Sequence, residues 1–169
     1  MKKILVILVG LPVVMAVMMT GSVLAINETI ENSVVDNCVG IKAQIRRLQI
    51  SDANSRIALG RSYDRISGEL MTNFNTRAEI NGQKNEELIR LAREFTRFAQ
   101  FFRESYRQYD NEIGRVLSID CVVRPSAFYA GLERLRLLRA GVRGNSDAII
   151  EITNMFREEV ETAFGGGDE

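Results

Sequence analysis

The sequence predicts an all-α protein, an elongated antiparallel three-helix bundle of coiled-coil type that follows an N-terminal signal peptide or signal anchor. Apolar side chains recur at steps of three and four residues along three long segments, which is the spacing of one helix face. Turn signals separate these segments, and the alternating apolar and polar runs that indicate strands are rare after the first 35 residues.

The N-terminal segment has the features of an export signal. Lys2 and Lys3 precede an apolar run over residues 4–19, which matches the basic and apolar regions of a signal peptide. Val23 and Ala25 stand at the third and first positions before a possible cleavage site. We therefore expect residues 1–25 to act as a signal peptide or, if they are not cleaved, as a membrane anchor.

The anchor alternative rests on length, because residues 4–24 can just span a bilayer as a helix. Both alternatives share one topology, since the two lysines stay inside and no other base occurs before Lys42. We expect the body of the protein to be extracytoplasmic, whether periplasmic, on the cell surface or secreted. It contacts a membrane only if the N-terminal segment is retained.

The rest of the chain divides into three parts. We expect residues 26–33 to form a short acidic linker, residues 34–164 to form the bundle, and the glycine-rich residues 165–169 to form a flexible tail. The dipeptide Asn81-Gly82 and Pro125 separate the helices, because the first favours a turn and the second opens a helix. The predicted helices span residues 34–79, 83–120 and 125–164.

Each predicted helix carries one apolar stripe. The first stripe contains Cys38, Ile41, Ile45, Leu48, Asp52, Ser55, Leu59, Tyr63, Ile66 and Leu70. The second contains Leu88, Leu91, Phe95, Phe98, Phe102, Tyr106, Tyr109, Ile113 and Val116. The third contains Phe128, Leu132, Leu135, Leu138, Val142, Ile149, Ile152, Phe156, Val160 and Ala163.

The stripes also predict which residues face each other, because paired positions in adjacent antiparallel helices have a constant sum. A sum of 161 aligns six apolar pairs of the first and second helices, including Ile45 with Val116 and Leu70 with Leu91. A sum of 244 aligns the second and third helices. Its pairs are Val116 with Phe128, Tyr109 with Leu135, Phe102 with Val142, Phe95 with Ile149 and Leu88 with Phe156.

The first register also predicts a polar layer inside the bundle. It places Asp52 level with Tyr109, and Ser55 level with Tyr106. Buried phenol hydroxyls need hydrogen-bond partners. We therefore expect the polar interruptions of the first stripe to satisfy the two tyrosines of the second.

The two cysteines are predicted to form a disulfide. The same register brings Cys38 and Cys121 within about one helical turn of each other, and export places them where a disulfide can persist. In the chain-entropy model a bond across about 80 residues stabilises the fold by roughly 4–5 kcal/mol. The alternative is a pair of buried free thiols.

No residue pattern indicates catalysis, a metal site or a cofactor. The chain has no His, which removes the commonest general base and metal ligand. The adjacent carboxylates Glu86-Glu87 and Glu158-Glu159 point about 100° apart on a helix and cannot converge on a substrate. We expect no enzyme activity and no cofactor. Nor do we expect nucleic-acid binding, since the aromatics of residues 95–103 belong mostly to the core stripe.

Charge indicates one possible binding surface. Residues 42–143 hold 19 bases and 12 acids, and most of the bases are Arg, whose guanidinium forms a rigid fork for carboxylate or phosphate. The candidates for an outward anion-binding face are Arg46, Arg61, Arg97 and Arg143.

These features favour a non-enzymatic exported interaction or scaffold protein of the cell envelope or the medium. Two alternatives remain: a periplasmic chaperone of the holdase type, and a binder of anionic envelope polymers. The expected partner is therefore an envelope protein or an anionic polymer. Stripes of this length can also be shared between chains, so a homo-oligomer is a further possibility.

Overall fold

The computed structural model describes the backbone over residues 20–165 and side chains over residues 28–165. This part of the chain is helical and contains no strand, which confirms the all-α prediction. The elements are α1 (Thr20–Arg65), the π-helix η1 (Ile66–Thr72), α2 (Asn73–Ile80), α3 (Glu86–Ser118) and α4 (Pro125–Phe164). The proposed signal or anchor lies mostly outside the described residues, as does the tail beyond Gly165.

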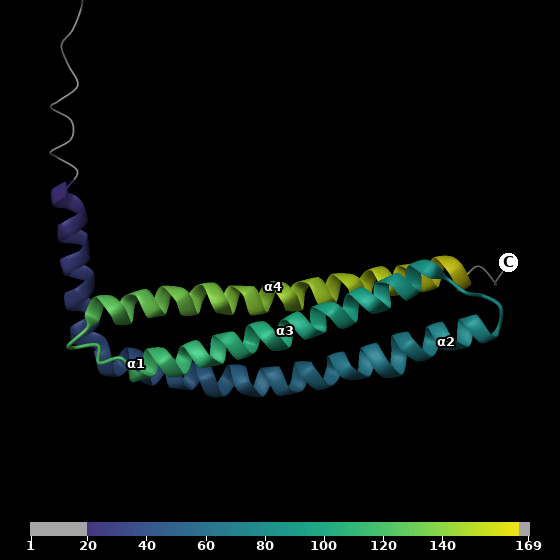
Figure 1. The fold of residues 1–169 in the computed structure, drawn as a ribbon, viewed down its shortest axis with the longest axis horizontal. Helices are drawn as coiled ribbons and strands as arrows, with labels where there is room; N and C mark the ends of the chain where they lie inside the picture. Colours follow the sequence, from purple (N-terminus) through teal and green to yellow (C-terminus); the bar gives the residue numbers. More distant parts are fainter. Residues whose placement is uncertain (1–19, 166–169) are drawn as a thin grey trace, which may run out of the picture.

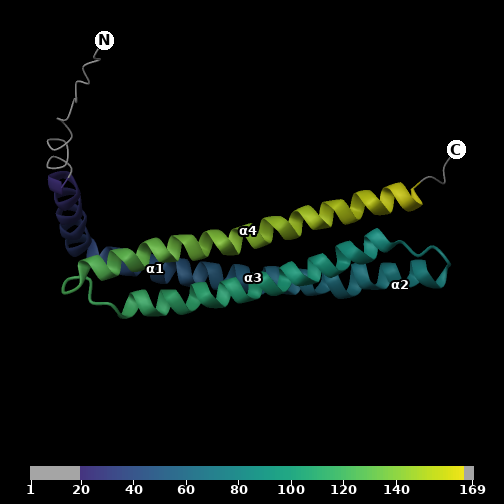
Figure 2. The same cartoon turned by 45° about the horizontal axis from the view of Figure 1, so that its top comes forward.

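Three long rods lie side by side in the structure (Figure 1). The first consists of α1, η1 and α2 without a break in helical backbone, and α3 and α4 form the other two. The chain reverses direction between successive rods, at opposite ends of the molecule (Figure 2). At about 1.5 Å per residue, the 40 residues of α4 extend over roughly 60 Å.

The expected linker over residues 26–33 is wrong, because these residues belong to α1, which begins at Thr20. The segment contains neither Gly nor Pro, so nothing in it interrupts a helix. Its apolar side chains also have packing partners, since Val34 is buried and Ile30 packs beside it in a core cluster. The other predicted helix ends agree with the structure within a few residues.

Local hydrogen bonds set the ends of the helices. The side chain of Asn85 caps α3 by accepting from the backbone N–H groups of Glu87 and Leu88, at 2.9 and 3.0 Å. In the preceding turn Gly82 has a φ of 72°, a conformation that costs little without a side chain. Pro125 stands at the first position of α4.

The α3–α4 pair is the closely packed half of the molecule. Its buried side chains form two clusters, one at the disulfide end and one at the α2 end, and both members of every predicted α3–α4 pair belong to the same cluster. A Cβ on Gly131 of α4 would lie only 2.7 Å from a methyl carbon of Val116 on α3. The structure therefore agrees with the predicted register for these two helices.

The first rod packs less completely than predicted. Ile45 and Tyr63 are buried, and the ring of Tyr63 meets those of Phe95 and Phe102 at centroid distances of 6.1 and 5.2 Å. However, three leucines of the same stripe remain exposed, with relative exposures of 41% for Leu48, 38% for Leu59 and 61% for Leu70. Three of the six apolar pairs predicted between the first and second helices, those of Leu48, Leu59 and Leu70, are therefore not closed against water.

The π-helix explains why Leu70 points outward. A turn of π-helix contains one more residue than a turn of α-helix, so the core face advances by five residues from Ile66 to Met71. Met71 is 2% exposed and takes the core position that the sequence pattern assigned to Leu70. Phe74 and Ala78 then continue the new phase along α2.

Candidate functional site

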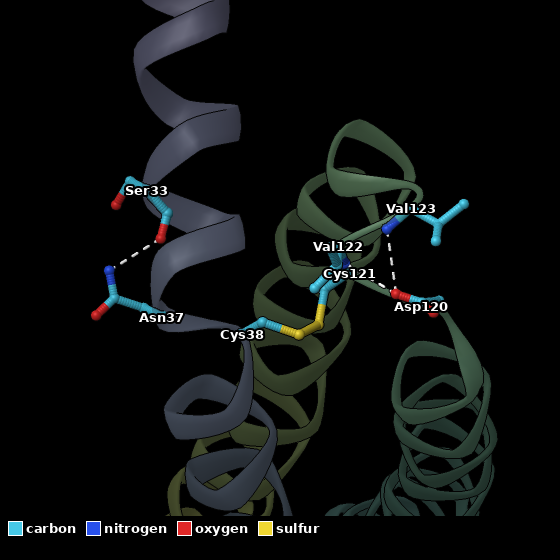
Figure 3. The surroundings of a disulfide bond; sticks show 7 residues. All are labelled: Ser33, Asn37, Cys38, Asp120, Cys121, Val122 and Val123. Atoms are coloured by element: carbon cyan, nitrogen blue, oxygen red, sulfur yellow. Dashed lines mark hydrogen bonds between the residues drawn. A yellow bond between two sulfur atoms is a disulfide. The ribbon is translucent and has the colours of Figure 1, made fainter.

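The first feature is an elbow in α1, at the end of the bundle where α3 connects to α4. Residues 20–37 form an arm that stands across the long axis of the bundle, whereas the remainder of α1 runs along it (Figure 1). Figure 3 shows Cys38 at this change of direction, joined to Cys121 of the α3–α4 connection. The Cα atoms of the two cysteines are 5.8 Å apart, and the predicted disulfide is confirmed.

Further contacts hold both sides of this disulfide. Cys121 is fully buried, and the carboxylate of Asp120 accepts hydrogen bonds from the backbone N–H groups of Val122 and Val123, at 3.0 and 3.1 Å (Figure 3). These bonds hold the pKa of Asp120 below its ordinary value. On the arm, Glu31 accepts a hydrogen bond from Ser126 in the first turn of α4. The base of the arm is thus attached to the bundle at more than one point.

The second feature is the polar layer, which lies nearer to the disulfide end of the bundle than to the α2 end. The hydroxyl of Tyr109 donates to Oδ2 of Asp52 at 2.9 Å, as the register predicts. Arg139 of α4 donates to both carboxylate oxygens of Asp52, at 2.8 and 2.9 Å. One carboxylate therefore connects all three rods through a bidentate ion pair and a phenol.

The charges of this layer reinforce one another. Partial burial alone would raise the pKa of Asp52, but the hydrogen bonds from Arg139 and Tyr109 outweigh it and keep the pKa below its ordinary value. Burial and the bond to Asp52 raise the pKa of Tyr109. At neutral pH the carboxylate is therefore charged and the phenol keeps its proton.

The other half of the predicted layer does not form. Ser55 is exposed, and its hydroxyl donates to the backbone carbonyl of Ser51, 3.1 Å away on the same helix. Tyr106 is only 4% exposed, and its hydroxyl has no hydrogen-bond partner among the described residues. The guanidinium of Arg56 instead lies over the Tyr106 ring, 5.1 Å from its centroid. A serine side chain is too short to cross from α1 to this phenol.

Sequence reasoning missed Arg139, which completes the layer. The two predicted registers together contain the missing signal, because they place Asp52 level with Tyr109 and Tyr109 level with Leu135. Arg139 lies one helical turn beyond Leu135. Comparison of the first helix with the third would therefore have indicated a cation within reach of the carboxylate.

A cavity of about 310 Å³ lies beside the polar layer, with α1 and α4 as its walls and α3 as its floor. We call it the central cavity. Its apolar lining comes from Leu59, Phe102 and Val142, and its charged rim includes Arg56, Arg143 and Asp147. Tyr109 and Arg139 also line a second cavity toward the disulfide, so the Asp52–Arg139 ion pair separates the two.

The four arginines proposed as an anion-binding face come from three helices. Arg143 lines the central cavity and Arg46 lines a shallow hollow beside the disulfide. Arg97 stacks on Phe98 and Phe101 of α3, with its guanidinium 5.4 and 5.9 Å from the ring centroids, and Arg61 is exposed on α1. No described cavity contains two of the four.

Among the described residues, no group of three or more acidic or Cys side chains is arranged to hold a metal ion. The helices in this part of the chain also include none with the length and apolar character needed to cross a membrane. No family model, curated protein or solved structure matches the chain.

Proposed function

We propose that the protein is a non-enzymatic, exported interaction protein that acts as an angled scaffold outside the cytoplasm. The observation that carries this proposal is the elbow, where the Cys38–Cys121 disulfide fixes the arm of α1 against the end of a long bundle. A disulfide persists where the surroundings are oxidising. The proposal also draws on the export signal read from residues 1–25.

The shape suits a scaffold that holds two elements at a fixed angle. The arm stands across a bundle roughly 60 Å long, and the disulfide with the Glu31–Ser126 contact keeps the angle between them. If residues 4–24 are retained in a membrane, the angle between arm and bundle places the bundle beside the membrane surface, where a partner can bind it. If they are cleaved, the arm itself is an interaction element.

The test begins with the protein recovered from its own cells. Intact mass is measured after thiol alkylation, with and without prior reduction. We expect no alkylation before reduction and two alkylated cysteines after it, together with either an N-terminus at Ile26 or an intact anchor. Two free thiols in the recovered protein would contradict an oxidised, extracytoplasmic scaffold.

The partner is then sought on the arm. A photoreactive residue is placed at exposed positions of the arm such as Asp36, and at Gln108 of α3, outside the arm, as a matched exposed control. We expect the same crosslinked envelope protein from the arm positions and not from position 108. Equal crosslinking from both would contradict a scaffold that acts through its elbow.

One observation favours the holdase alternative as a second candidate. A holdase needs exposed apolar side chains, and Leu48, Leu59 and Leu70 of the first rod are exposed, each beside a different cavity. The decisive measurement is suppression of aggregation of an unfolded envelope protein. Under this alternative, replacing Leu48 and Leu70 with Gln weakens the suppression several-fold, whereas failure of the unaltered protein to suppress aggregation removes the alternative.

A further inference from the structure

The central cavity combines an apolar floor with two arginines that take part in no ion pair among the described residues. Arg56 of α1 and Arg143 of α4 stand on its two walls, and neither belongs to the salt bridges of the structure, although Arg139 beside them is paired with Asp52. The cavity therefore holds charge that the protein itself does not neutralise.

From this arrangement we propose that the central cavity binds a small amphipathic anion, a single short aliphatic chain that ends in a carboxylate. The chain lies against Leu59, Phe102 and Val142, and the headgroup meets Arg56 and Arg143. This site is independent of the scaffold function proposed above, since it needs neither the arm nor a membrane anchor.

The balance of charge favours an anion over a neutral or cationic ligand. Asp52 and Arg139 neutralise each other through two hydrogen bonds. The remaining charged groups of the lining are Arg56, Arg143 and the single carboxylate of Asp147. The rim therefore keeps a net positive charge, and a guanidinium binds a carboxylate through charge-assisted hydrogen bonds.

The size of the cavity favours a small ligand over a helix from another protein. Its volume of about 310 Å³ lies at the lower end of the range for small-molecule sites, roughly 300–1,000 Å³. The Asp52–Arg139 ion pair joins α1 to α4 at one end of the cavity, so a helix cannot lie continuously along the space between these rods. A lipid with two acyl chains is likewise too large.

The test uses three probes with the same chain length and different headgroups: decanoate, decanol and decyltrimethylammonium. The full chain is held in a lipid nanodisc so that no detergent competes, and empty nanodiscs provide the blank for calorimetric titration. We expect decanoate to bind at least tenfold more tightly than decanol, and the cationic probe not to bind. Equal affinity for the three probes, or no binding of decanoate, would overturn the proposal.

Matched variants separate the cavity from general attraction to a basic protein. Arg143→Gln and Arg56→Gln are each expected to weaken decanoate binding about tenfold, in line with the loss of one hydrogen bond to a charged group. Arg97→Gln removes the same charge from α3 outside the cavity and should leave the affinity unchanged. If Arg97→Gln weakens binding as much as Arg143→Gln, the attraction is diffuse and the site is wrong.

Two further measurements locate the ligand. A diazirine analogue of decanoate should label peptides of α1 and α4 that contain Leu59 or Val142. Leu59 is partly exposed, so Leu59→Trp should fill the cavity and abolish this labelling without changing the circular dichroism spectrum. Vesicles of an anionic phospholipid should not compete with the analogue. Competition by the vesicles would assign the cavity to a membrane lipid instead of a free acid.

Discussion

The α3–α4 pair and the first rod carry similar apolar stripes but bury them to different extents. Along α3 and α4 the stripe residues pair across the interface and reach zero exposure at positions such as Phe95 and Phe128. Along α1 the stripe alternates between buried residues such as Ile45 and exposed ones such as Leu48. The comparison teaches that α3 and α4 supply most of the core, and that the first rod adds only some of its stripe residues to it, such as Ile45 and Tyr63.

The contacts that hold the first rod are of more than one kind. A disulfide holds α1 at one end, the Asp52–Arg139 ion pair holds it further along, and apolar packing of Met71 in the core holds the rod toward the other end. Between them lie the cavities and the exposed leucines. If this comparison is right, damage to these contacts should release the first rod, whereas damage to the α3–α4 core should unfold the whole domain.

The largest effect should come from the disulfide. Replacing Cys38 and Cys121 with Ser should lower the free energy of unfolding by about 4–5 kcal/mol in the chain-entropy model. Hydrogen exchange should show the loss first in α1, because α3 and α4 keep their own core. Denaturant unfolding compared with that of the oxidised native protein provides the measurement, and an equal rise of exchange in α4 would contradict the comparison.

A pair of truncations tests the two halves directly. Phe128→Ala should cost about 3–5 kcal/mol, as expected for a fully buried aromatic residue. Leu48→Ala should cost well under that, about 1 kcal/mol or less, because the side chain is already 41% exposed. Similar losses in urea unfolding would show that α1 is as closely packed as α3 and α4.

Disrupting the polar layer should lower stability by a smaller amount, which depends on pH. Asp52→Asn leaves the Arg139 guanidinium without its counter-charge and should cost about 1–3 kcal/mol at pH 7. Since the folded-state pKa of Asp52 is lowered, its contribution is present above about pH 4 and is lost as the pH falls through that folded-state value. Stability of the variant should therefore decrease less on acidification.

The matched control for this titration is Asp36→Asn, which removes a carboxylate from an exposed position on the arm. Thermal unfolding followed from about pH 7 to pH 2 should separate the two variants. The full sequence contains no His, so no side chain with an ordinary pKa near neutrality complicates the profile. Equal acid sensitivity of the Asp52→Asn variant and the unaltered protein would contradict a role for this ion pair.

The smallest expected changes in stability come from replacing two glycines, one in each half of the molecule, with Ala. Gly131→Ala places a methyl group 2.7 Å from a methyl carbon of Val116 in the α3–α4 interface. The cost of this overpacking, about 1–3 kcal/mol, should exceed the stability of about 1 kcal/mol that Ala gains over Gly in a helix, so the variant should be less stable. Gly60→Ala on α1 meets nothing within 4 Å and should stabilise the protein. Opposite shifts in melting temperature are the expected result, and shifts of the same sign would contradict the comparison.

The sequence predicts the closed half of this molecule better than the open half. Apolar periodicity identifies α3, α4 and their register, because the five aligned positions each pair an aromatic side chain with an aliphatic one in the partner helix. The cysteine pair is predictable from the other register, that of the first and second helices, which brings Cys38 and Cys121 within about one helical turn of each other. Periodicity cannot show that Leu48 and Leu59 stay exposed, because a stripe indicates which face is apolar but not how closely a partner approaches it.

The remaining differences arise from interactions that involve more than two helices. Arg139 reaches Asp52 across the layer only when both registers are combined. The π-helix is invisible to a search for steps of three and four, because its extra residue shifts the phase from Leu70 to Met71. The helical state of residues 26–33 depends on packing of Ile30 and Val34 against the end of the bundle.

The π-helix also has a consequence for how such a chain can change over generations. When one residue is inserted into a helix, a single π-helical turn can take up the extra residue, so the helix on either side keeps its packing against the core. Residues 66–72 form such a π-helix. A relative that lacks one residue there would carry an ordinary α-helix, with both flanking faces still in place. An alignment of such relatives should therefore allow a one-residue gap between Ile66 and Thr72, where a long uninterrupted helix would otherwise argue against it.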